Sequence, residues 1–118
     1  MEKLNTTGSF WLDTNNNYWS YDTQLTCNHN GYRLVNNTFY SMTTRKHQGQ
    51  ITATARDIYL DVGHYGHMRP TEDLQANLKL QQDMLIKLES TRNSKHKQTK
   101  INACKQQIAL IKKAMEVA

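Results

Sequence analysis

The sequence predicts an α+β protein in which a small antiparallel β-meander of about four strands and one helix precede a C-terminal antiparallel helical hairpin. Three observations predict this class. Apolar and aromatic residues alternate with polar ones in the first third of the chain, which is typical of half-buried strands. Beyond Thr44 the apolar residues recur every three or four positions, and in the last third they follow a heptad pattern. Both spacings indicate amphipathic helices.

The expected strands are short and separated by turn-forming residues. After a loose start over residues 1–8, the strand patterns cover residues 9–13, 18–27, 32–35 and 38–42. The longest of these alternates Trp19, Tyr21, Leu25 and Cys27 with polar residues, so one face is expected to be buried. Asn30-Gly31 favours a two-residue hairpin, because these residues adopt the positive φ angles that a type I′ turn requires.

The stretch from Thr38 to Gln48 begins like a strand and continues like a helix. Thr43 and Thr44 are candidate N-caps, because a threonine hydroxyl can accept from a free backbone N–H. The predicted helix continues to Val62 with Ile51 and Ile58 on its apolar face. Gly49 weakens this prediction, and the threonines at 52 and 54 would also suit a strand.

The last third predicts two helices that pack against each other. Heptad positions hold Leu74, Leu78, Leu85 and Leu88 in the first, and Ile101, Cys104, Ile108, Ile111 and Met115 in the second. The polar segment 90–94 joins them, and Ser94 is a candidate N-cap. The expected division is therefore a sheet-and-helix domain over 1–62, a Gly-containing linker over 63–70 and a helical hairpin over 71–118.

A hairpin standing alone buries only one face of each helix, so we expect a homodimer with a four-helix seam. The residues expected in that seam are Leu85, Leu88, Ile101, Ile108 and Ile111.

Composition limits the possible partners and locations. The 118 residues suffice for one core and one projecting element, and two Trp, six Tyr and two Phe supply large buried areas. The formal net charge of +5 favours acidic partners, either nucleic acid or an acidic protein surface. The residues after Met1 do not form a signal peptide, and no run of about 18 apolar residues occurs. We expect no membrane association, a location in the cytoplasm, and two free thiols at Cys27 and Cys104.

Two groups of polar and basic residues are candidate binding sites for a partner or a phosphate. The first lies at the expected helix start, where such groups could converge on one exposed anion-binding spot: Thr43, Thr44, Arg45, Lys46 and His47. Arg33 is added to it from the preceding strand. The second lies at the tip of the hairpin and contains Arg92, Lys95, Lys97 and Lys100. The alternative is that the first group is only a solvated first helical turn.

Two segments share the order aromatic-Ser-x-x-Thr: residues 19–23 and residues 40–44. Either two strand ends deliver hydroxyl groups to one place, or the similarity is chance in a sequence rich in threonine.

Catalytic and metal-binding motifs are weak. His64-x-x-His67, with His47, Asp61 or a cysteine nearby, offers too few ligands at defined spacing for a closed zinc site. Cys27 and a histidine could form a nucleophile and its base, but no motif marks an oxyanion site. Asp22 and His47 could form an acid–base pair, but carboxylate–imidazole pairs are also common as purely structural contacts. No phosphate-binding or dinucleotide-binding glycine motif occurs. We therefore predict no metal, no cofactor and no enzymatic activity.

Residues 40–48 (Tyr-Ser-Met-Thr-Thr-Arg-Lys-His-Gln), preceded by residues 18–25 (Tyr-Trp-Ser-Tyr-Asp-Thr-Gln-Leu), carry a resemblance. They resemble a small bacteriophage-encoded domain of unknown function with a Tyr-Ser-x-Thr-Thr-x-Lys-His motif. The likeness covers about residues 8–60 and leaves the hairpin unexplained. It implies a phage origin rather than an activity. Arg45 stands where that domain more often has a small residue, which makes this stretch more basic.

Two function classes follow from these observations. The first is a phage accessory protein that binds and inhibits a host protein, such as a nucleic-acid-handling defence factor, in an anti-CRISPR or similar anti-defence role. The second is a basic protein that binds DNA or RNA through Arg and Lys on phosphates and aromatic rings on bases. Salt dependence separates the classes, because phosphate binding weakens steeply with salt.

Overall fold

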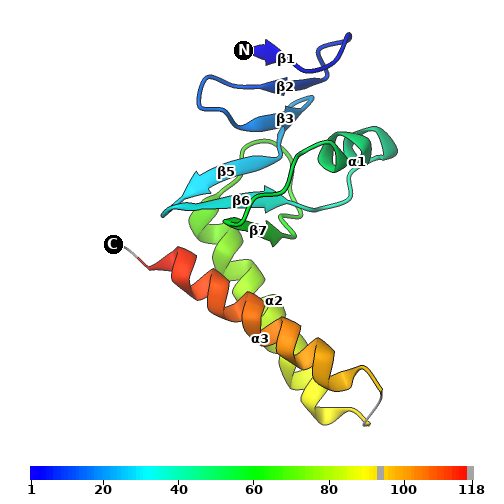
Figure 1. The fold of residues 1–118 in the computed structure, drawn as a ribbon, viewed down its shortest axis with the longest axis vertical. Coiled ribbons are helices and arrows are strands. Elements are labelled where there is room, and N and C mark those ends of the chain that lie inside the picture. The colour runs from blue at the N-terminus through cyan, green and yellow to red at the C-terminus, as the bar shows by residue number, and fades with distance from the viewer. Residues whose placement is uncertain (93–94, 117–118) are drawn as a thin grey trace.

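The computed structural model describes residues 1–92 and 95–116. The elements are β1 (Glu2–Lys3), β2 (Phe10–Leu12), β3 (Tyr18–Ser20), β4 (Thr23–Gln24), β5 (Thr26–His29), β6 (Tyr32–Asn36), α1 (Met42–Gly49), β7 (Asp57–Leu60), α2 (Pro70–Ser90) and α3 (Lys97–Met115). They form two small sheets with α1 beside them, and a long helical hairpin that projects from the second sheet (Figure 1). The predicted α+β class is confirmed.

The first sheet is antiparallel with the order β1-β2-β3-β4. Trp11 and Trp19 face each other across β2 and β3, and their rings stack at a centroid distance of 5.1 Å. The segment expected to be loose contributes the edge strand β1. The predicted long strand over 18–27 is divided into β3, β4 and the start of β5, because Tyr21 turns the chain with a φ of 53°.

The second sheet has the order β5-β6-β7. The predicted hairpin at Asn30-Gly31 joins β5 to β6, with φ angles of 50° and 82° at the two turn residues. By contrast β7 runs parallel to β6, with Leu34 opposite Ile58. Parallel neighbours need a crossover connection, and residues 37–56, which contain α1, supply it.

The prediction of one helix from Thr44 to Val62 is wrong, because α1 ends at Gly49 and β7 follows. In β7, Ile58 and Leu60 are each 1% exposed while Tyr59 between them is 48% exposed. This alternation has the period of two that a strand requires, and it allows β7 to bury both side chains while it pairs with β6.

The predicted fourth strand over 38–42 is also wrong, because residues 37–41 belong to no strand. Side-chain hydrogen bonds replace the ladder there. The amide of Thr38 donates to Asn36 Oδ1 at 3.1 Å, and the Thr38 hydroxyl accepts from the amides of Val62 and Gly63 at 2.7 and 2.9 Å. These bonds position the segment that leads into α1.

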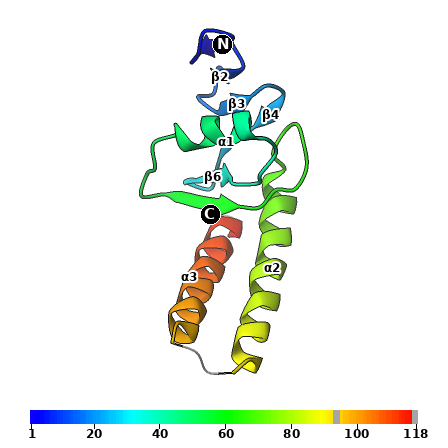
Figure 2. The ribbon, with the colours of Figure 1, turned by 90° about the vertical axis from the view of Figure 1, so that its right-hand side faces the viewer.

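The second sheet and the base of the hairpin share one core. Its buried members are Leu34, Ile58, Leu60, Met68, Leu74, Ile111 and Ala114. Figure 2 shows α2 and α3 side by side below the sheet, as the heptad pattern predicted. Farther from the sheet, Ile101 and Cys104 are buried between the two helices. The division into two domains stays a prediction, and the predicted cap at Ser94 lies outside the described residues.

We predict that Ile111→Ala destabilises the protein by about 2–5 kcal/mol, because it leaves a cavity in the shared core. Ile86→Ala is the matched control, since Ile86 lies in the same hairpin but is 66% exposed. Its effect should stay within about 0.5 kcal/mol. Urea unfolding of both variants measures the difference, and equal free energies of unfolding would contradict the shared core.

Candidate functional site

The start of α1 is fixed by Ser41 rather than by the predicted caps Thr43 and Thr44. Ser41 has an extended backbone with a φ of −160°, and its hydroxyl accepts from the amide of Thr44 at 3.1 Å. This is the usual geometry of an N-cap serine. The helix therefore begins at Met42, two residues earlier than Thr44.

The predicted convergence of the basic stretch on one exposed spot is wrong. Thr44 and His47 lie one helical turn apart and point inward, each 5% exposed. Thr43 and Lys46 are exposed, and Arg45 is half-buried. The Arg45 guanidinium donates to Asn37 Oδ1 at 2.9 Å and lies over the Phe39 ring.

The inward side chains of α1 join the first sheet through Ser20. Ser20 Oγ lies 2.7 Å from His47 Nδ1 and 3.0 Å from Thr44 Oγ1, and all three residues are buried. The Phe10 ring stacks on the His47 ring at a centroid distance of 4.8 Å. Burial lowers the pKa of His47, so the neutral imidazole is favoured there.

A serine hydroxyl beside an imidazole has the composition of a nucleophile and its base, and here both groups are buried. The amide oxygen of Asn5 accepts from the amide of Phe10 at 3.2 Å, which turns the Asn5 NH2 group toward His47 Nε2 at 3.5 Å. The same NH2 group donates to Ser9 Oγ at 2.8 Å. Both ring nitrogens of His47 thus have a polar neighbour, and the tautomer sets whether Nδ1 donates to or accepts from Ser20 Oγ.

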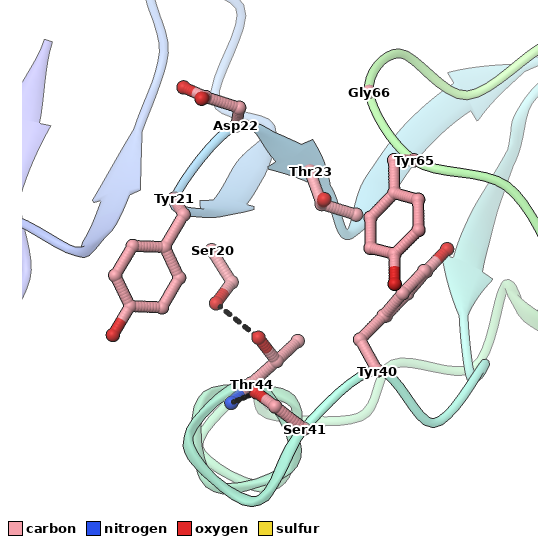
Figure 3. Close-up of a pocket in the computed structure, with 9 residues that line it drawn as sticks. All are labelled: Ser20, Tyr21, Asp22, Thr23, Tyr40, Ser41, Thr44, Tyr65 and Gly66. Carbon is pink, nitrogen blue, oxygen red and sulfur yellow. Dashed lines mark hydrogen bonds between the residues drawn. The ribbon is translucent and has the colours of Figure 1, made fainter.

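A pocket opens directly above this cluster, and we call it the hydroxyl pocket. Its volume is about 650 Å³, and its lining is Ser20, Tyr21, Asp22, Thr23, Tyr40, Ser41, Thr44, Tyr65 and Gly66. The lining includes the Ser and Thr of both aromatic-Ser-x-x-Thr segments, so the structure brings these hydroxyl residues to one place (Figure 3). The shared pattern was the signal that could be read in the sequence. Tyr65 and Gly66, from the loop before α2, were missed.

Arg33 is engaged in an ion pair within the second sheet. Its guanidinium donates to both carboxylate oxygens of Asp57 at 2.7 Å and to the carbonyl of Thr52 at 2.7 Å. Burial alone would raise the pKa of Asp57, but hydrogen bonds from Arg33 and Thr54 outweigh it and lower that pKa. Arg33 therefore serves the β6–β7 pairing and does not join the basic residues of α1.

The predicted tip cluster is largely exposed. Arg92, Lys95 and Lys100 are exposed, and Lys97 is half-buried with its ammonium group donating to the carbonyl of Thr91 at 2.7 Å. Figure 1 shows the tip at the far end of the hairpin from α1. The two predicted basic groups therefore lie on separate surfaces.

One side of the hairpin carries a groove that the sequence analysis missed, and we call it the arm groove. Its volume is about 520 Å³, and it is lined by Gln81, Met84, Leu88, Lys100, Ala103, Cys104 and Gln107. Met84 is 44% exposed, and Leu80, one turn before it on α2, is 45% exposed. The signal was present in the sequence as apolar residues that flank the heptad core positions.

The residues predicted to form a seam between two copies pack between α2 and α3 of one chain. Ile111 is fully buried and Ile101 is 7% exposed, so these two side chains are already covered. Leu85, Leu88 and Ile108 are half-buried. The homodimer stays a prediction, and a second copy would have to use exposed side chains such as Met84 and Ile86 instead.

The histidines weighed as metal ligands lie in separate contacts. His64 Nε2 lies 2.8 Å from a carboxylate oxygen of Asp73, His67 meets the Trp19 ring edge-on, and His47 contacts Ser20. Within residues 1–92 and 95–116, no three His, Cys, Asp or Glu side chains gather as a metal site would require. Both cysteines are free thiols.

No protein-family model, no curated protein and no solved structure matches the chain significantly. Of the helices in the described part of the chain, none combines the length and the apolar character needed to cross a membrane.

We predict that the free energy of unfolding falls as the pH drops below about 6.5, the pKa of an unfolded histidine. Burial lowers the pKa of His47 in the folded state, so between these two pKa values the unfolded state binds more protons and is favoured. The free energy of unfolding should not change with pH just above about 6.5. His47→Gln keeps a donor for Ser20 without titrating, so urea unfolding between about pH 7 and about pH 5 should show a smaller slope. An unchanged slope would contradict the buried neutral His47.

Proposed function

We propose that this protein is a non-enzymatic phage accessory protein that binds and inhibits a host protein, namely a nucleic-acid-handling defence factor, in the host cytoplasm. The observation that carries the proposal is the projecting hairpin with an unfilled apolar groove along one side. The phage origin rests on the resemblance of residues 40–48 and 18–25 to the phage-encoded domain.

The hairpin is suited to reach a partner because, within residues 1–92 and 95–116, the sheet region covers only its base. Leu74 and Ile111 pack into the shared core, whereas farther out the two helices bury only their facing sides. A surface with Met84, Leu80 and Leu110, which are 44%, 45% and 37% exposed, remains beside the arm groove. Exposed apolar side chains gathered on one surface are typical of protein interaction sites.

The lining of the arm groove also defines the chemistry of the partner. Met84, Leu88 and Ala103 accept an apolar side chain, and Lys100 lies at the same groove to meet an acidic one. Residues 71–118 carry nine Lys and Arg against five Asp and Glu. The helical hairpin as a whole is therefore positively charged and attracts an acidic surface. The partner is therefore an acidic protein surface with a protruding apolar residue.

We predict that Met84→Glu abolishes inhibition, because it places a negative charge in the groove that the partner must fill. Gln82→Glu is the matched control, since it adds the same charge to the same helix at an exposed position on the other side of the arm. The measurement is the plaquing efficiency of a restricted phage on bacteria that carry nuclease-based defence systems and express each variant. The wild type and Gln82→Glu should restore plaquing with at least one system, and Met84→Glu should not. Failure of the wild type with every system, or equal restoration by both variants, would contradict the proposal.

The exposed basic tip favours nucleic acid binding as a second candidate. For this candidate, Lys95→Glu combined with Lys97→Glu should weaken binding to labelled DNA and RNA oligonucleotides and flatten its salt dependence. Arg45→Glu combined with Lys46→Glu changes the charge equally but should weaken binding less, because both residues lie on α1, away from the hairpin tip (Figure 1). Fluorescence anisotropy across a salt series measures both. Equal losses would mean that net charge alone attracts the nucleic acid, and this would contradict a specific site at the tip.

A further inference from the structure

We propose that the hydroxyl pocket binds a neutral sugar ring. This inference is independent of the arm groove, because the pocket lies between the β3–β4 turn, the first turn of α1 and the loop before α2 (Figure 3). Its volume of about 650 Å³ is that of a small-molecule site and leaves room for a saccharide.

The charge of the lining argues for a neutral ligand. Asp22 is the charged residue among the nine that line the pocket, and none of the nine is Lys, Arg or His. An anionic group would meet a carboxylate without a compensating cation there, which is unfavourable. The hydroxyl groups of Thr23 and Ser41 can both donate and accept, which matches the hydroxyl groups of a sugar.

The Thr23 hydroxyl is available to a ligand. Thr23 lines the pocket, and its hydroxyl bonds to no residue among those that the structure describes. Its oxygen is open to the pocket, since Gln48 Oε1 is the one fully buried side-chain oxygen or nitrogen without a partner in the described part of the chain. Ser41 has spare capacity as well, because its oxygen accepts from the amide of Thr44 while its O–H remains free to donate. Two hydroxyls from different segments therefore remain to bind a ligand.

The tyrosine rings supply the second half of sugar recognition. Tyr21 and Tyr65 line the pocket and are 54% and 75% exposed. The ring centroids of Tyr65 and Tyr40 lie 5.1 Å apart. A sugar ring has apolar C–H faces and polar edges, so it can pack on an aromatic face while its hydroxyls bond to the pocket wall.

The backbone of Tyr21 supports a role for its ring. Tyr21 adopts a φ of 53° in the two-residue turn between β3 and β4, where glycine or asparagine would be favoured. Its amide donates to the carbonyl of Ser9 at 2.7 Å, and its carbonyl accepts from Trp11 Nε1 at 3.0 Å. Surrounding bonds thus hold an aromatic residue in an unfavourable conformation, and the outcome is a ring placed at the pocket mouth.

The test is an NMR titration of the full-length, nitrogen-labelled protein. The probes are the methyl glycosides of glucose, galactose, mannose and N-acetylglucosamine, with inorganic phosphate as the anion probe. At least one glycoside should produce saturable shifts at the amides of residues 20–23 and 41–44, with a Kd on the order of millimolar, and phosphate should produce none. Shifts with phosphate at these amides, or with no glycoside, would overturn the proposal.

Two variants test whether the chemical-shift changes come from binding in the hydroxyl pocket. Thr23→Val removes the unpaired hydroxyl without removing any hydrogen bond within the described chain, and should weaken binding roughly tenfold. Thr43→Val is the matched control, because Thr43 is exposed on α1 and does not line the pocket. Tyr21→Asn, which suits the positive φ, should also weaken binding while it preserves the fold. The proposal would be overturned if Thr23→Val or Tyr21→Asn bound the glycoside as tightly as the wild type does.

Discussion

The buried amide side chains of Gln24 and Asn36 join the two sheets and the loop before α2. Gln24 Nε2 donates to the carbonyl of Thr26 at 2.9 Å, and Gln24 Oε1 accepts from the amide of Met68 at 2.8 Å. Asn36 Nδ2 donates to the carbonyl of Gln24 at 3.1 Å and to the Tyr40 hydroxyl at 2.9 Å. Both residues are at most 5% exposed. Breaking one of these bonds would leave a buried polar group unpaired, at a cost of about 1–3 kcal/mol.

The hydrogen bonds of these buried polar side chains also position the walls of the hydroxyl pocket. Asn36 holds the Tyr40 hydroxyl, which also donates to the carbonyl of His64, so two walls of the hydroxyl pocket are fixed together. Ser20 holds α1 through His47 and Thr44 on the remaining side. A chain with only 37% hydrophobic residues thus uses short polar side chains where a larger apolar core would otherwise connect the elements.

The hairpin and the turn at Asn30-Gly31 could be predicted from the sequence, because heptad spacing and turn chemistry are local signals. The strand β7 was missed because Ile51, Ile58 and Val62 recur at helical spacing, and because its pairing with β6 depends on a partner more than 20 residues away. The candidate site was predicted in part. The shared aromatic-Ser-x-x-Thr order marks the hydroxyl residues of the pocket, but the inward direction of His47 depends on Ser20 and Phe10, which no local pattern links to α1.

We infer that the buried side-chain hydrogen bonds and the shared core make the two sheets and the hairpin one cooperative unit. Native-state hydrogen exchange tests it most directly, because it reports the opening free energy of each amide. We expect the amides of Leu25, Met68 and Ile111 to exchange with the same opening free energy, that of global unfolding. Exchange of Leu25 and Met68 at a clearly lower opening free energy than Ile111 would contradict a single cooperative unit, since the segment between the sheets and the loop before α2 would then open while the hairpin stays folded.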